Sequence, residues 1–319
     1  MKFKKRLNFK KIALYFLVLG ISLVLFLGYL TFIRSKIGWD GRKDVNIAFV
    51  SDSFLVGNFS QDKKQVYLVS FPDDLVLEVG GGYGRYPVTS LWDLYEEEGQ
   101  NPFKGIKKTG IDSLGVSIDG IIHFENEKEL DDYLRKFSSG AETNFFGLCG
   151  YFFNNGFKTN MSFYDYFRLV RKLSSLRSSQ IEVMNLGDGI IIEEELFDES
   201  VVSSFNEEVM DNFLREYFSD FEVTNEGLRI EIMNGTGEPF LAGDVARVIN
   251  NMGGKVIYIG NTDKIKKSRI ELDSKVKDSK TVKRVMDIFI FEVVEKEMTK
   301  NADISIFLGR DWLEVNLNE

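Results

Sequence analysis

The chain has 319 residues, 44% of them hydrophobic and 28% charged, which is enough for two modest globular units and unlike a disordered or fibrous protein. One cysteine excludes an intramolecular disulfide framework, and one histidine excludes zinc sites that need two histidine ligands. The formal charge of −9 leaves no basic surplus for the phosphate backbone of nucleic acid. We therefore expect no nucleic-acid partner and little scope for metal or hydrolase chemistry.

Residues 12–33 form an apolar segment without a single charge. As a helix this segment spans about 33 Å, the thickness of the hydrocarbon core of a bilayer. It does not end in the small residues of a signal-peptide cleavage site, so we expect an uncleaved transmembrane helix. Residues 1–11 are basic without acidic residues, which predicts a cytoplasmic N-terminus. The sequence thus predicts a single-pass protein of the cell membrane with its bulk outside the cytoplasm.

The region 44–223 alternates between patterns typical of strands and of helices, which predicts an α/β domain. The expected elements are strands at 45–50 and 65–70, a glycine loop at 80–84, helices at 89–98 and 128–137, and a loop followed by a strand at 113–124.

The region 224–319 is expected to form a second, small α/β sandwich of the order β-α-β-β-α-β. Its expected elements are strands at 228–233, 255–259, 268–272 and 304–308 and helices at 240–251 and 280–296. The turn Gly235-Thr236-Gly237 does not match a dinucleotide-binding turn, because Phe240 stands where the third glycine should be.

Aromatic residues crowd between Phe145 and Arg171. Aromatic residues at this density usually fill a core, although they can also line an apolar groove or a membrane-facing patch. Phe152, Phe153 and Phe157 are the candidate residues of a lipid groove. In the same stretch, Cys149 is expected to be a buried small apolar residue.

Two adjacent carboxylates, Asp73 and Asp74, follow the strand at 65–70, and Arg85 lies in the next loop. Carboxylates at the end of a strand can hold Mg²⁺ while water and a phosphate fill the other positions, and Asp52 after the first strand is a further candidate ligand. The alternative is an ordinary solvated turn. His123 lies within an apolar strand and is expected to be packed or on the surface, not a general base.

Two stretches resemble a known family. The run LRIEIMNGTGEPFLAGDVARVINNMGGKVIYIGNTD, with the later ADISIFLGRDW, resembles the LytR C-terminal domain over residues 226–313. Residues 44–124 resemble a reduced LytR-CpsA-Psr domain, with VSFPDD where that family has S-I-P-R-D, followed by LGVSIDG. Such domains commonly occur together on a single-pass anchor.

The resemblance implies transfer of a polyprenyl-diphosphate-linked glycopolymer onto the bacterial cell wall, with Mg²⁺ on aspartates and arginines on the diphosphate. Asp74 aligns with the motif aspartate, and Asp52 can be aligned with an earlier aspartate of the family, which makes both candidate metal ligands. Asp74 and Arg85 are the catalytic candidates of an active enzyme. Asp73, however, stands where the motif has an arginine, so a negative charge there would repel an anionic substrate.

The later R-x-R motif of the family has no counterpart, since Arg168 and Arg171 are spaced differently. We therefore expect a degenerate, non-catalytic binding or scaffold protein of the cell envelope, without a cofactor. Its expected partners are the membrane and a polyprenyl-phosphate-linked glycan or another envelope component. The alternative is a Mg²⁺-dependent phosphotransferase.

Overall fold

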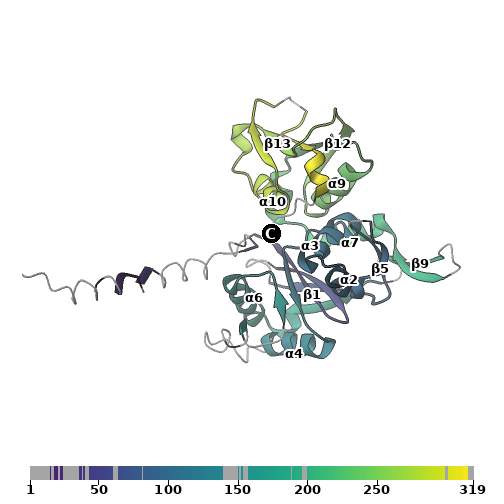
Figure 1. Ribbon diagram of the computed structural model, residues 1–319, viewed down its shortest axis with the longest axis vertical. Helices are drawn as coiled ribbons and strands as arrows, with labels where there is room; N and C mark the ends of the chain where they lie inside the picture. Colours follow the sequence, from purple (N-terminus) through teal and green to yellow (C-terminus); the bar gives the residue numbers. More distant parts are fainter. Residues whose placement is uncertain are drawn as a thin grey trace, which may run out of the picture.

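The computed structural model describes residues 43–298, except 60–63, 81, 139–149, 151, 154–156, 188 and 196–199, together with residues 301–314 and the positions 15, 18–20, 22, 23, 36, 37 and 39. It is a mixed α/β structure with two main sheets (Figure 1). The predicted α/β class is confirmed.

The larger sheet has six strands in the order β7-β6-β1-β2-β3-β8. Its strands β1, β6, β3 and β8 run in one direction, so their C-terminal ends lie at one edge of the sheet. The bounds are β1 (Val45–Val50), β2 (Phe54–Phe59), β3 (Val66–Phe71), β6 (Gly120–His123), β7 (Lys158–Thr159) and β8 (Ile181–Asn185). The strand expected at 45–50 is confirmed, and that at 65–70 is found one residue later.

Helices cover both faces of this sheet, which explains why β1 is buried throughout and apolar except for Asn46 instead of alternating. On one face, Ala48 and Val50 pack with Trp92 and Met210; on the other, Ile47 packs in a separate cluster with residues of α4 and α6. The helices are α2 (Leu91–Glu97), α3 (Pro102–Thr109), α4 (Glu127–Ser138), α6 (Phe163–Ser175), α7 (Glu207–Phe218) and α8 (Phe221–Glu226), and a π-helical turn (Gly110–Leu114) continues α3.

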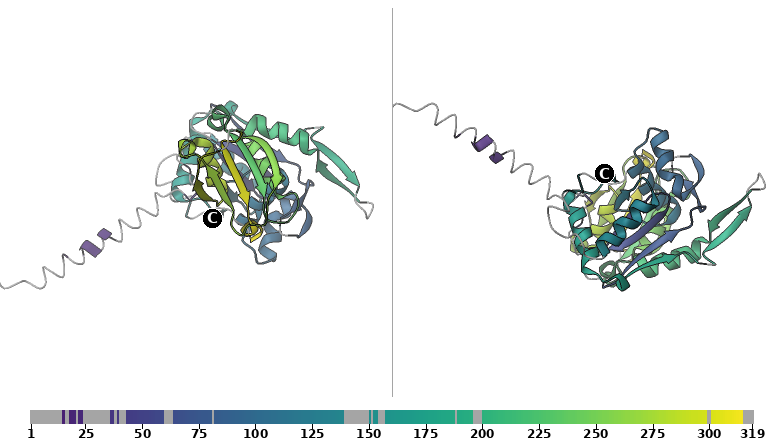
Figure 2. Two further views of the ribbon diagram at one scale, coloured as in Figure 1. Left: turned by 90° about the horizontal axis from the view of Figure 1, so that it is seen from above. Right: turned by 90° about the horizontal axis from the view of Figure 1, so that it is seen from below.

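Two strand pairs lie outside the main sheets. The strands β4 (Val76–Val79) and β5 (Gly84–Pro87) form one antiparallel pair, and β9 (Ile191–Glu195) and β10 (Val201–Phe205) form the other. The β9–β10 hairpin reaches away from the rest of the molecule (Figure 2). The sequence patterns did not predict β2, α3, α7 or this hairpin.

The C-terminal sheet has five strands in the order β12-β11-β15-β13-β14. The helices α9 (Leu241–Asn251) and α10 (Lys280–Ile288) lie between this sheet and the N-terminal part of the molecule (Figure 1). The strands are β11 (Arg229–Asn234), β12 (Lys255–Asn261), β13 (Arg269–Leu272), β14 (Glu292–Glu295) and β15 (Ile304–Leu308).

The prediction of a helix at 280–296 is wrong for the second half of that range. The helix α10 ends at Ile288, because Phe289 adopts an extended conformation (φ −118°, ψ 143°) and is fully buried beside Phe291 and Trp312. The following residues form β14, in which β-branched Val293 and Val294 pair with β13. The expected order β-α-β-β-α-β therefore gains one strand.

The expected transmembrane helix at 12–33 lies almost entirely outside the described residues, as does Cys149. Within the part of the chain that the structure describes, no helix has both the length and the apolar character needed to cross a membrane.

Candidate functional site

The three predicted carboxylates lie at the C-terminal edge of the larger sheet. Asp52 lies in the turn between β1 and β2, and Asp73 and Asp74 follow the end of β3. The turns are neighbours because Phe54, just after Asp52, pairs with Phe71, just before the second turn. All three side chains are exposed. The fold thus brings these carboxylates to one edge, where open α/β sheets commonly bind ligands.

Asp74 has a partner that the sequence did not indicate. The hydroxyl of Ser203 in β10 donates to its Oδ2 at 2.6 Å, and the neighbouring Leu75 forms a parallel bridge with Ser203. The β9–β10 hairpin therefore contacts the predicted catalytic aspartate directly.

Arg85 is hydrogen-bonded to one carboxylate and lies opposite another. Its Nη1 and Nη2 donate to Oε1 and Oε2 of Glu194 at 2.8 and 2.7 Å, and Glu78 lies opposite it in the β4–β5 pair. The hydrogen bonds to Glu194 outweigh partial burial and raise the pKa of Arg85, and the same bonds lower the pKa of the Glu194 carboxyl. In this structure the guanidinium is thus occupied by an internal anion.

The predicted magnesium ligands do not form an evident cage. Among the described residues, no group of three or more His, Cys, Asp and Glu side chains is arranged to hold a metal ion. Since Mg²⁺ often takes only one or two protein carboxylates and completes its shell with water and phosphate, the assignment of Asp52 and Asp74 as ligands stays a prediction.

His123, at the end of β6, stacks on the indole ring of Trp92, with ring centroids 3.9 Å apart and planes 14° apart. Burial lowers the pKa of His123, and the charge of Lys158 lowers it further. A neutral, stacked imidazole fits the expected packed histidine.

Arg168 is engaged elsewhere: its guanidinium donates to the carbonyl oxygen of Trp39 and, at 2.8 Å, to the hydroxyl of Tyr164. It therefore anchors the segment that precedes β1.

Most of the aromatic segment that is described is packed. Phe152 contacts Phe163 and Tyr166 edge-on or tilted, with centroids 5.4 and 5.1 Å apart, and Phe157 stacks on Tyr166 at 5.6 Å. Phe153 is 65% exposed. The predicted lipid-groove residues thus divide into two that pack against the core and one on the surface.

The sequence patterns also missed a contact between the C-terminal sheet region and the N-terminal part. Arg284 of α10 donates to both carboxylate oxygens of Asp119 at 2.8 and 2.9 Å and to the hydroxyl of Ser117 at 3.1 Å. From α9, Arg247 donates to the carbonyl of Ser113, and Asn251 donates to that of Gly115. Two helices thus hold the segment 113–119, which leads into β6.

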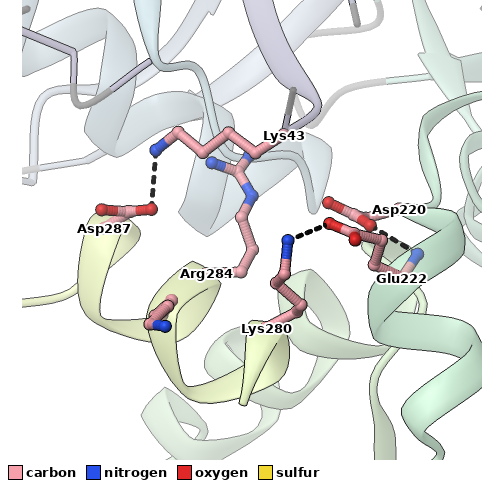
Figure 3. A pocket seen from close by; sticks show the side chains of 7 residues that line it. Lys43, Asp220, Glu222, Lys280, Arg284 and Asp287 are labelled. Carbon is pink, nitrogen blue, oxygen red and sulfur yellow. Dashed lines mark hydrogen bonds and ion pairs between the residues drawn. The ribbon is translucent and has the colours of Figure 1, made fainter. Parts of the chain in front are cut away.

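A cavity of about 290 Å³ opens beside Arg284 at the same contact (Figure 3). Its charges are largely paired: Lys43 bonds Asp287 at 2.6 Å, and Lys280 bonds Glu222 at 2.6 Å. Four cations and three carboxylates line the cavity, and one of these cations, Arg284, is paired with Asp119 outside the lining. The charges of this cavity therefore mainly bind one another.

Comparison with known families gives one match in the C-terminal region. Residues 227–312 match the family model described as LytR cell envelope-related transcriptional attenuator. No curated protein matches the chain. The chain therefore carries a LytR C-terminal domain, of a family described as cell envelope-related.

Solved structures give further similarities at low identity. TagT of B. subtilis is 13% identical, with 56% of this chain and 91% of that chain covered and a TM-score of 0.40. The LytR-CPS2A-psr family protein YwtF (TagT) with bound octaprenyl pyrophosphate lipid is 14% identical, with 58% and 95% covered and a TM-score of 0.40. Protein gbs0355 from Streptococcus agalactiae is 10% identical, with 55% and 87% covered and a TM-score of 0.42. The family match by itself confirms the predicted resemblance of the C-terminal region to the LytR C-terminal domain.

Proposed function

We propose that this protein is a membrane-anchored, extracytoplasmic component of the cell envelope that binds or scaffolds without catalysing transfer. The anchor and its orientation follow from the apolar segment 12–33 and the basic residues before it. The envelope setting follows from the LytR C-terminal domain at 227–312. The ligand class that the resemblance implies is a polyprenyl-diphosphate-linked glycan.

The observation that carries the non-catalytic proposal is the excess of carboxylates at the site, where Glu194 pairs with Arg85 and Asp73 is exposed. An arginine that stabilises a diphosphate in a transition state must present its donors to the substrate. Here both terminal nitrogens bind a carboxylate, and exposed Asp73 adds negative charge where the resembling motif has an arginine. The candidate site therefore presents more negative than positive charge to an anionic substrate.

The alternative is a Mg²⁺-dependent phosphotransferase that uses Asp74, Asp52 and Arg85. The placement of Asp52 and Asp74 at one sheet edge supports this alternative. A bound Mg²⁺ would supply the positive charge that the missing arginine does not.

The test is an assay of the full chain in detergent, with Mg²⁺ and a polyprenyl-diphosphate-linked glycan. We expect no transfer or cleavage from the unmodified protein, and Asp73→Arg to strengthen diphosphate binding without turnover. Turnover that disappears in Asp74→Ala and survives in Asp278→Ala, at a carboxylate that is 95% exposed, would favour the enzyme.

The orientation has its own test. A reporter that works only outside the cytoplasm should be active when fused after Glu319. A reporter that works only inside the cytoplasm should be silent there, and its activity would contradict the proposed topology.

A further inference from the structure

One hairpin contacts both predicted catalytic side chains. From β9, Glu194 binds the guanidinium of Arg85 through two hydrogen bonds, and from β10, Ser203 donates to Asp74. Asp74 lies in the turn before β4, whereas Arg85 faces Glu78 near the other end of β4. The β9–β10 hairpin therefore reaches along the site and contacts each end of it.

The hairpin is attached at its base and exposed beyond it. Ile191 and Phe205, a directly opposed pair, pack against the buried cluster of the larger sheet. Further out, Ile192 is 43% exposed and Val201 is 62% exposed. Because a two-stranded hairpin is only marginally stable by itself, contacts such as that of Glu194 help to determine where it lies.

The pair of Arg85 and Glu194 is well oriented but accessible. The side chains are 29% and 42% exposed, so water and salt screen their attraction. A guanidinium binds a carboxylate and a phosphate with the same two-pronged geometry. An anion with two suitably spaced oxygens can therefore exchange with the Glu194 carboxylate.

We propose that Glu194 is an internal competitor for the anionic ligand of Arg85, so that a diphosphate group binds there by displacing Glu194 and loosening the β9–β10 hairpin. This inference rests on the proposed function, since it assumes that the site takes a diphosphate-bearing ligand. It makes Glu194 the residue that sets the affinity of the site, and it leaves open whether transfer follows binding.

The hairpin provides a matched control. Glu193 and Glu195 carry the same charge on neighbouring positions of β9 and are exposed. Glu194→Gln and Glu193→Gln therefore change the net charge equally, while only the first removes the carboxylate from Arg85.

The experiment titrates inorganic pyrophosphate into the full chain in detergent by calorimetry. We expect Glu194→Gln to bind at least about threefold more tightly than the unmodified protein and Glu193→Gln to stay within about twofold of it. Adding Arg85→Gln to Glu194→Gln should abolish the gain. Equal gains in both single variants, a gain that persists without Arg85, or no pyrophosphate binding in any variant would overturn the proposal.

Hydrogen exchange supplies a second measurement. Saturating pyrophosphate should speed amide exchange in residues 191–195 and 201–205 of the unmodified protein, as Glu194→Gln does without ligand. Binding that leaves this exchange unchanged would overturn displacement of the hairpin. These outcomes are separate from the transfer assay, because turnover that depends on Asp74 would reject the non-catalytic function and leave competition by Glu194 intact.

Discussion

Arg284 of α10 and Asp119, which are 165 positions apart in the sequence, form a bidentate ion pair whose side chains are only 4% and 6% exposed. Burial opposes both charges, yet the attraction prevails: the pKa of Asp119 is lowered and that of Arg284 is raised. The main-chain N–H of Asn46 also donates to Asp119, at 2.7 Å. This pair ties the LytR C-terminal domain to the start of β1.

We expect Arg284→Ala to lower the free energy of unfolding by about 3–5 kcal/mol, because it leaves the Asp119 carboxylate buried without its cation. Denaturant unfolding of the full chain measures the loss. Lys283→Ala removes the adjacent but exposed cation and should cost less than about 1 kcal/mol. Similar losses in the two variants would contradict the role assigned to the buried pair.

Asp244 of α9 gives a dependence of stability on pH. Burial, reinforced by the charge of Asp112, raises its pKa to about 6, although Arg247 and Lys108 oppose the shift. Since the unfolded carboxyl titrates at about 3.8, the folded protein binds this proton more tightly, and Asp244 destabilises the fold increasingly as the pH rises from about 4 to 7.

Asp244→Asn should therefore stabilise the protein by about 1–2 kcal/mol at neutral pH, after allowance for solvent screening, and by almost nothing near pH 4. Denaturant unfolding at several pH values measures this difference. Asp263→Asn, at an exposed carboxylate of the same domain, serves as the control. A gain from Asp244→Asn that is independent of pH would refute the raised pKa as its cause.

The two adjacent phenylalanines of the aromatic segment should respond differently to substitution. Phe152→Asp should lower the free energy of unfolding by about 2–4 kcal/mol, because Phe152 packs against Phe163 and Tyr166. Phe153→Asp should change it by less than about 1 kcal/mol, because that ring is largely exposed.

Binding of polyprenyl phosphate to both variants tests the lipid-groove prediction. If these rings line a groove, both variants lose binding while they keep the fold. Loss of the fold in Phe152→Asp, with normal binding in Phe153→Asp, would support the core interpretation instead.

The fragment 224–319 should fold by itself. Among the described residues of its buried cluster, Ile111 is the one that comes from outside the fragment. Removing the rest of the chain exposes Arg284 to water, so no uncompensated charge stays buried. Cooperative thermal unfolding and dispersed amide signals are the expected results, and a fragment without dispersed signals would show that its core needs the contact with 113–119.

The sequence by itself determined the elements whose hydrophobic pattern is local and strong. The apolar run of β1 and the alternation of β11 predict strands because burial of their side chains depends on periodicity along a short segment. The same patterns predicted the α/β class, and the residues of the C-terminal region predicted the LytR C-terminal domain that the family model confirms.

Tertiary structure alone decided where α10 ends and what the charged residues of the site contact. The helix pattern ran past Ile288, but pairing of β14 with β13 and burial of Phe289 favour an extended chain there. Arg85 is hydrogen-bonded to Glu194, which is 109 positions away in the sequence, and Asp74 is hydrogen-bonded to Ser203, which is 129 positions away. Such partners are not encoded in local spacing, because side chains distant in sequence become neighbours only when the packing of sheets and helices brings their backbones together.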